Sequence, residues 1–274
     1  MFKTIWDAVG DKLYELGIDR GVLYRHDGDS RYAASEAWNG LTSINEAPEG
    51  GESNDKYADN IKYASLTSAE SFGGTINAFT YPESFEECDG SKAAANGVYV
   101  TGQNRQPFGL SYRTKVGNDV KGEDYGYKLH LVWGAKANPS DKDRETINES
   151  PEATEFSWEF TTTPESVTAE GYRPTSHIVI DTTRLDESGK AALTTLENIL
   201  YGVQAQPAVY TKTTDVTPKT GKTYYTYDST TKTYTEFEGS TFDSETDYYE
   251  LTSPAVVETE GRLPTPDEVI DLFT

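Results

Sequence analysis

The sequence predicts a mainly β protein with one helix packed against its strands and a small β module inserted near the C-terminal end. Several segments alternate apolar and polar residues with a period of two, which is typical of strands with one buried face. Only one long segment, residues 186–201, has apolar residues at helical spacing. The chain also has 19 Tyr and 10 Phe, residue types that favour strands and bury a large area each, although only 35% of its residues are hydrophobic.

The first third of the chain predicts strands separated by polar segments. Strands are expected at residues 20–25, 36–45, 61–66 and 76–81. The polar stretch 46–56 between them predicts an exposed loop. Residues 1–19 mix helix-like apolar spacing with Gly10 and Gly17, which predicts a short helix or an arm. An arm would suit assembly.

The middle of the chain carries the best hairpin signal, formed by residues 108–116 and 125–135. In the first segment Leu110, Tyr112 and Thr114 share a face opposite Ser111, Arg113 and Lys115. In the second, Leu129, Leu131 and Trp133 oppose Lys128, His130 and Val132. The connector, residues 117–124, is too long for a two-residue turn and contains three acids, so we expect a mobile, projecting acidic loop.

The next elements are two strands and the one helix. Residues 154–163 place Phe156, Trp158 and Phe160 on one face and Glu155, Ser157 and Glu159 on the other, which predicts a sheet with one wet side. Residues 176–181 predict another strand. In residues 186–201, Leu193, Leu196 and Leu200 form one apolar stripe, with Asp186 as N-cap and Gly202 as C-terminal stop.

The composition changes between residues 205 and 253, where Thr, Tyr and Lys dominate. Residues 223–227 and 233–237 flank a turn-rich connector and predict a hairpin, and residues 247–251 predict a third strand. We interpret residues 205–253 as an inserted β module in which the tyrosines pair across strands. After it, Thr265, Pro266 and Glu268 form a capping box for a short amphipathic helical turn.

The charge of the chain limits its partners. Its 24 Lys and Arg against 46 Asp and Glu give a net charge of -22. Such an acidic surface repels nucleic acid, so the sequence does not predict sequence-specific nucleic-acid binding through phosphate contacts. The single cysteine allows no intrachain disulfide, and no Cys/His spacing suits zinc. No signal peptide or apolar run of 18 residues occurs, so we expect synthesis in the cytoplasm, solubility before assembly and no membrane partner.

Three groups of reactive residues stand out, and none predicts catalysis. Glu86, Glu87 and Asp89 are interpreted as a solvated acidic turn, because adjacent carboxylates face different ways. Cys88 is interpreted as an inert or partly exposed thiol. The histidines, which are His26, His130 and His177, lie on or beside separate strands without a Ser or Cys motif. No catalytic, cofactor-binding or metal site is therefore predicted, and the protein is not expected to be an enzyme.

An ordered series of motifs resembles a known family. The motifs are Gly21–Tyr24, Trp38–Ser43, Asp55–Gly90, Phe108–Thr114, Gly117–Asp119, Gly126–Val132, Ser150–Ala153, Phe156–Glu159 and the ending Arg262–Pro264 to Phe273. Together they cover roughly residues 15–204 and 261–273. The series resembles the major tail proteins of long-tailed, non-contractile phages and prophages, mostly of Gram-positive hosts.

The resemblance implies a fold, partners and a location. It implies a tail-tube-type β-sandwich or barrel with a flanking helix, closing into a hexameric ring and stacking into a hollow tube through which DNA leaves the virion. The tail tube domain would comprise residues 1–204 and 254–274, and the inserted module residues 205–253. Expected partners are the chain itself and the tape measure, terminator and distal tail proteins, with genomic DNA passing through without specific binding. The tail would be assembled in the bacterial host cytoplasm.

Two functional alternatives and one detail of the tube remain open at this point. A host-surface or carbohydrate-binding protein would bind its ligand through the Tyr-rich module. A glycoside hydrolase would need a pair of catalytic carboxylates, and the sequence indicates no such pair. If the chain forms a tube, we expect the module on its outer face and an acidic channel wall. The wall candidates are Glu155, Ser157 and Glu159, and the opposing basic candidates are Arg113, Lys115 and Lys128.

Overall fold

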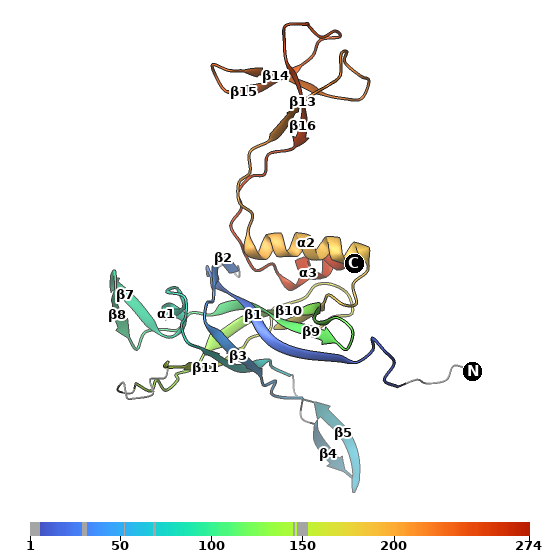
Figure 1. The fold of residues 1–274 in the computed structure, drawn as a ribbon. Helices are drawn as coiled ribbons and strands as arrows, with labels where there is room; N and C mark the ends of the chain where they lie inside the picture. The colour runs from blue at the N-terminus through green and yellow to red at the C-terminus, as the bar shows by residue number, and fades with distance from the viewer. Residues whose placement is uncertain (1–5, 29–31, 52, 68–69, 145, 147–152) are drawn as a thin grey trace, which may run out of the picture. The chain divides into compact units, whose positions relative to one another are not determined.

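The computed structural model describes residues 6–28, 32–51, 53–67, 70–144, 146 and 153–274 (Figure 1). The chain divides into two compact units, one comprising Met1–Tyr201 with Glu260–Thr274 and the other Gly202–Thr259. The first unit is built on an eight-stranded sheet, and the second on a four-stranded sheet. The protein is therefore mainly β, with one main helix and a separate small β module, as the sequence predicts.

The main sheet curls around a core of its own. Its strands are β1 (Leu13–His26), β2 (Tyr32–Ala37), β3 (Leu41–Glu46), β6 (Gly73–Ala78), β9 (Phe108–Asn118), β10 (Gly122–Ala137), β11 (Phe156–Thr162) and β12 (His177–Asp181). They follow the order β2-β1-β9-β10-β11-β6-β3, and β12 pairs with the middle of β10, residues 128–132. All of these pairings are antiparallel. Strands β1 and β3, near the two ends of this order, also lie in contact, so the sheet is strongly curved.

The β9–β10 hairpin separates two cores because both of its faces are buried. Leu110 and Tyr112 of β9 join Val132 of β10 in the first core, which contains Trp158, Phe160 and Phe85. The other face of β10 presents Leu129, Leu131 and Trp133 to the second core. The face assignments predicted from the alternation are thus confirmed. Full burial of each large side chain contributes about 1.5–3 kcal/mol, so this hairpin makes a large contribution to the stability of the unit.

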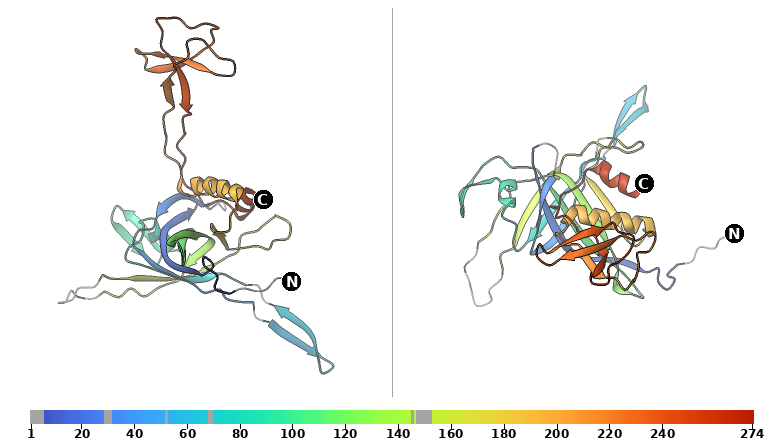
Figure 2. Two further views of the ribbon diagram at one scale, coloured as in Figure 1. Left: turned by 45° about the vertical axis from the view of Figure 1, so that its right-hand side comes forward. Right: turned by 90° about the horizontal axis from the view of Figure 1, so that it is seen from above.

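Two helices cover the second core, and they lie side by side in both views of Figure 2. Helix α2 (Glu187–Tyr201) buries Leu193, Leu196 and Leu200, as predicted. Asp186 caps it by accepting a hydrogen bond from the Gly189 amide at 2.8 Å. Helix α3 (Pro266–Phe273) has the predicted capping box between Thr265 and Glu268 and buries Val269. A third helix, α1 (Phe85–Cys88), is a single turn against the first core.

Two predictions for the N-terminal region are wrong. Residues 13–18 form the first half of β1 and pair with β9, so a helix over 1–19 is excluded there, while residues 1–5 lie outside the described part. Gly17 adopts a φ of +62° where the β1–β9 register shifts, and this bulge disguised the strand period. The strand expected at 36–45 is two strands, β2 and β3, separated by a turn at Asn39 and Gly40.

Two predicted loops are partly strand. Residues 53–56 of the expected 46–56 loop belong to β4 (Ser53–Ala58), which forms a separate hairpin with β5 (Ile61–Thr67). The expected acidic loop at 117–124 is a turn of three residues, because Gly117 and Asn118 end β9 and Gly122 begins β10. Asn118 Oδ1 closes this turn by accepting hydrogen bonds from the amides of Val120 and Lys121. A further two-stranded sheet joins β7 (Ser91–Ala95) to β8 (Val98–Thr101).

The second unit is a small antiparallel sheet. Its strands are β13 (Val209–Lys212), β14 (Tyr224–Asp228), β15 (Thr233–Phe237) and β16 (Tyr248–Ser253), in the order β13-β16-β14-β15. The predicted hairpin and third strand are confirmed, whereas β13 was not predicted. Main-chain pairing between Val203 and Thr259, and between Gln206 and Val256, brings the two ends of the unit together. Such closely paired ends are typical of an insertion into a loop.

Candidate functional site

The predicted channel residues lie on one exposed polar face of the main sheet. Ser157 and Glu159 of β11 are exposed. Trp158, which lies between them in the sequence, and Phe160, which follows Glu159, are buried. The register continues the polar side chains onto the neighbouring strands, with Ser157 opposite Asn77 and Glu159 opposite Thr75. We call this surface the polar face; it comprises Ser43, Asn45, Thr75, Asn77, Ser157 and Glu159. These six residues include one carboxylate and no Lys or Arg, but the register continues the face through Thr161 to the exposed Lys136 of β10. Glu155, just before β11, is exposed and accepts a hydrogen bond from Thr42 Oγ1.

Two of the three basic candidates, Arg113 and Lys128, are paired with acids of β1. The Arg113 guanidinium forms an ion pair with Asp19 at 2.9 Å and lies 4.4 Å from the centre of the Tyr127 ring. Lys128 forms an ion pair with Glu15. Lys115 is half-buried. Two of the three cations of this strip are therefore paired with acids, whereas Lys115 has no ion-pair partner among the described residues.

The acidic turn predicted at Glu86, Glu87 and Asp89 is wrong in one respect, because Asp89 is buried. Its carboxylate forms ion pairs with Arg105 at 3.1 Å and with Lys142 at 2.5 Å. A buried carboxylate needs such partners to offset its lost hydration. Cys88 beside it is also buried rather than partly exposed, and burial raises the pKa of its thiol to about 12. These residues hold the β7–β8 region to the core and form no reactive centre.

A polar cluster that the sequence did not predict joins Glu46, His130 and His177. His130 Nδ1 lies 3.2 Å from His177 Nε2 and 3.3 Å from Glu46 Oε1. The Tyr112 hydroxyl donates a 2.7 Å hydrogen bond to the same Glu46 oxygen. Hydrogen bonding from His130 and Tyr112 holds the pKa of Glu46 at about 2. Burial lowers the pKa of His177 to about 4, so at neutral pH the cluster combines a carboxylate with an uncharged His177 imidazole.

No sequence signal could have found this cluster. Its three residues come from β3, β10 and β12, and their spacing in the chain follows no ligand motif. The β10–β12 pairing, which sets His130 opposite Val179 and His177 opposite Val132, brings the two imidazoles together. His26 lies elsewhere, with its ring against Tyr32.

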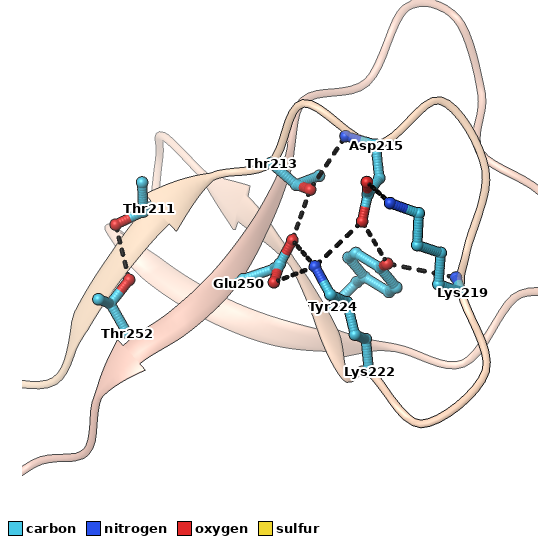
Figure 3. Close-up of polar contacts among 8 residues, drawn as sticks. All are labelled: Thr211, Thr213, Asp215, Lys219, Lys222, Tyr224, Glu250 and Thr252. Carbon is cyan, nitrogen blue, oxygen red and sulfur yellow. Dashed lines mark hydrogen bonds and ion pairs between the residues drawn. The ribbon is translucent and has the colours of Figure 1, made fainter.

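One face of the second unit carries a polar network together with Tyr224 and Tyr248, and the other face carries five more tyrosines, which are Tyr210, Tyr225, Tyr227, Tyr234 and Tyr249. In the network Lys222 bridges Asp215 and Glu250, and Asp215 also accepts hydrogen bonds from Lys219 and from the Tyr224 hydroxyl (Figure 3). On the opposite face the predicted cross-strand aromatic pairing is present. Tyr227 lies opposite Tyr234 with ring centres 4.9 Å apart, and Tyr210 stacks on Tyr234 at 3.8 Å. The tyrosines therefore contribute to the packing of the module.

Comparison with known proteins identifies the family. The sequence model described as phage tail tube protein matches residues 16–205, which is about two thirds of the chain. Within the described residues this range contains the whole main sheet except the first residues of β1, together with α2. The motif Ser150–Ala153 falls in the matched range, although residues 150–152 lie outside the described part. No helix in the part that the structure describes is long and apolar enough to cross a membrane. A search of curated proteins found no match. The chain belongs to the phage tail tube protein family, whose members are structural components of the virion tail.

Proposed function

We propose that this chain, a structural and non-enzymatic subunit of the phage tail tube, closes into rings of six copies that stack into the conduit for DNA. The observation that carries the proposal is the family match over residues 16–205, which spans nearly the whole main sheet and α2. A ring requires a head-to-tail interface whose rotation closes after six steps. Negative-stain microscopy of the purified protein tests this directly: rings or tubes with six-fold class averages are expected. A strictly monomeric chain, at high concentration and with tail-initiation proteins present, would contradict the proposal.

The β4–β5 hairpin is our candidate for a contact between copies. It forms a sheet separate from the main one, and four of its large apolar or aromatic side chains are exposed: Tyr57, Ile61, Tyr63 and Leu66. Exposed apolar groups of this kind gain free energy when another surface covers them. In Figure 1 the hairpin extends beyond the strands of the main sheet.

The hairpin contact can be tested by a pair of deletions. Replacing Ser53–Thr67 with a short Gly-Ser linker is expected to abolish tubes while leaving a folded monomer, as judged by circular dichroism. Removing residues 204–258 and joining Val203 to Thr259 with a similar linker is the matched control, and tubes are expected to persist. Tubes that form without the hairpin would exclude it as an essential contact.

The polar face is our candidate for the channel wall. The only charged side chain among its six residues is the Glu159 carboxylate, whereas Arg113 and Lys128 are paired with acids. The exposed Lys136 of β10 lies at the edge of this face, opposite Thr161 and diagonal to Glu159. A wall in which a carboxylate lies beside its lysine offers the phosphates of DNA fewer counterion-releasing contacts than a basic wall does. The wall would therefore be close to neutral, and DNA would pass through it without specific binding. A tube structure with its bore ringed by Arg113, Lys115 and Lys128 would contradict this placement.

The remaining partners follow from the position of a tube subunit in a tail. We propose that residues 205–253 decorate the outer face of the tube, since the closely paired ends of this module make it a local insertion. The tube ends would contact the tape measure, terminator and distal tail proteins. Cryo-electron microscopy of assembled tails tests both points, and density for the module inside the channel would refute its outer placement.

A further inference from the structure

We propose that Glu46, His130 and His177 form a binding site for one transition-metal ion of the Zn²⁺ class. The three side chains each offer one ligand atom, and these atoms all lie within 4.8 Å of one another. The site is independent of the tube, because every residue in it belongs to one copy of the chain.

The distances between the ligand atoms suit a tetrahedral ion. Zinc binds imidazole nitrogen at about 2.0–2.1 Å and carboxylate oxygen at about 2.0–2.2 Å, so neighbouring ligands of a tetrahedral site lie roughly 3.3–3.5 Å apart. His130 Nδ1 is 3.2 Å from His177 Nε2 and 3.3 Å from Glu46 Oε1. The two distances match two edges of such a site. The remaining pair, Glu46 and His177, lies within 4.8 Å, so these two side chains would have to move closer together around an ion.

The surrounding residues hold the ligands in the orientation that binding needs. Thr114 Oγ1 lies 3.1 Å from His130 Nε2, where it can accept a hydrogen bond from Nε2–H. When an ion binds, the Nδ1 proton that is donated to Glu46 would be released, and the Nδ1 lone pair would bind the ion. The Tyr112 ring stacks on His130 with the ring planes 7° apart, and Phe72 stacks on His177 with centres 4.2 Å apart. The Tyr112 hydroxyl orients the Glu46 carboxylate. Loss of such outer contacts typically weakens metal binding by about 10–100-fold.

The chemistry of the ligands selects the class of ion. Two imidazoles and one carboxylate suit Zn²⁺, Co²⁺ or Ni²⁺, whereas Ca²⁺ and Mg²⁺ prefer sites made of oxygen alone. Three protein ligands leave a fourth tetrahedral position for water or for a group from another molecule. The ion would link β3 to β10 and β12; β3 and β12 are not neighbours in the sheet. Bound metal is therefore expected to stabilise the curved sheet as well as to occupy the site.

The test uses the full chain without a histidine tag, stripped with EDTA and dialysed. Isothermal titration with ZnCl₂ is expected to give one ion per chain, and CaCl₂ is expected to give no binding. Co²⁺ is expected to give the intense visible absorption of a tetrahedral complex, which Zn²⁺ then removes. The thermal midpoint of unfolding is expected to rise with Zn²⁺.

His177→Gln and Glu46→Gln are each expected to weaken binding at least tenfold. His26→Gln is the matched control, because His26 lies outside the cluster, and it is expected to bind as the unchanged chain does.

Either of two results would overturn the proposal. One is the absence of stoichiometric Zn²⁺ and Co²⁺ binding by the unchanged chain, which would leave the cluster as a hydrogen-bonded network only. The other is binding that persists at full strength in both His177→Gln and Glu46→Gln. Circular dichroism of each variant establishes that it is folded, and the Co²⁺ spectrum of the unchanged chain tests the site even if a variant does not fold. Tube formation is scored separately, so failure of the metal site does not bear on the proposed function.

Discussion

The indole Nε1 of Trp133 donates a 2.8 Å hydrogen bond to the carbonyl oxygen of Pro264, 131 residues further along the chain. Trp133 is fully buried on β10, and Pro264 immediately precedes the capping residue of α3. Leu263 adds a main-chain bond to Tyr32 of β2 at 3.0 Å. The segment that follows the second unit is thus fixed to the centre of the first unit by contacts that do not involve residues 202–259.

Replacing Trp133 with Phe is expected to destabilise the first unit substantially. The substitution leaves the buried Pro264 carbonyl without its donor, which costs about 1–3 kcal/mol, and the lost volume adds to this. Trp158→Phe is a matched control, since Trp158 is equally buried but its Nε1 has no hydrogen-bond partner among the described residues. Urea unfolding followed by far-ultraviolet circular dichroism measures both. Equal losses of stability in the two variants would contradict the role given to the Trp133 bond.

Cys88 is expected to resist thiol reagents in the folded protein. Burial raises the pKa of its thiol from 9.0 to about 12, which lowers the reactive thiolate fraction at pH 8 by about a thousandfold, and the buried sulfur is also hard to reach. Because the chain has one cysteine, labelling reports this position alone. A coloured disulfide reagent at pH 8 is expected to react with less than one tenth of the chains until urea is added. Rapid reaction without denaturant would mean that the α1 region opens readily.

The polar network of the second unit is expected to make that unit acid-sensitive. Hydrogen bonds from Lys219 and Tyr224 lower the pKa of Asp215 from 3.8 to about 2. Because the folded pKa is the lower one, the contribution of Asp215 to stability is complete above pH 3.8 and is lost as the pH falls through 2. Tyrosine near-ultraviolet circular dichroism at increasing temperature, recorded between pH 5 and pH 2, follows the loss.

The matched variants for this acid effect are Asp215→Asn and Asp247→Asn. Asp215→Asn is expected to lower the stability at pH 5 and to flatten the fall between pH 4 and pH 2. Among the described residues Asp247 forms only an exposed ion pair with Lys212, so Asp247→Asn is expected to leave the stability nearly unchanged at any pH. An unchanged pH profile in Asp215→Asn would show that other groups govern the acid response.

Local signals in the sequence predicted the elements whose causes are local. The alternation around Trp158, the leucine stripe of α2 and the capping box at Thr265 each lie within one element, and each prediction is confirmed. The first half of β1 was missed because its pairing with β9, about a hundred residues away, outweighs the helix-like spacing of its apolar residues. The bulge at Gly17 also breaks the strand period there.

The polar clusters were missed for the same physical reason. Asp89 looked solvated beside two other acids, but its partners Arg105 and Lys142 lie 16 and 53 residues away. His130 and Glu46 are 84 residues apart in sequence, and only the curvature of the main sheet brings them to 3.3 Å. Partners that are distant in the chain leave no spacing pattern that a single sequence can reveal. A resemblance to a family, in contrast, implies the fold in which such partners meet.

Placing a positive charge on the polar face is expected to slow DNA release, provided that this face lines the channel. In Glu159→Lys each copy presents an exposed ammonium where a carboxylate stood, and six copies would set six of them around the bore. Duplex DNA carries one charge per about 1.7 Å of its axis, so each ammonium can displace a counterion and hold a phosphate. The attraction acts over about 8 Å at physiological salt, so the slowing is expected to be greatest at low ionic strength.

Glu236→Lys makes the same change of charge at an exposed position of the second unit and serves as the control. Release of DNA from virions built with each variant, timed at two salt concentrations, distinguishes the cases. Slow release confined to Glu159→Lys, and relieved by added salt, supports the polar face as the channel wall; equal rates in all three particles would place this face elsewhere.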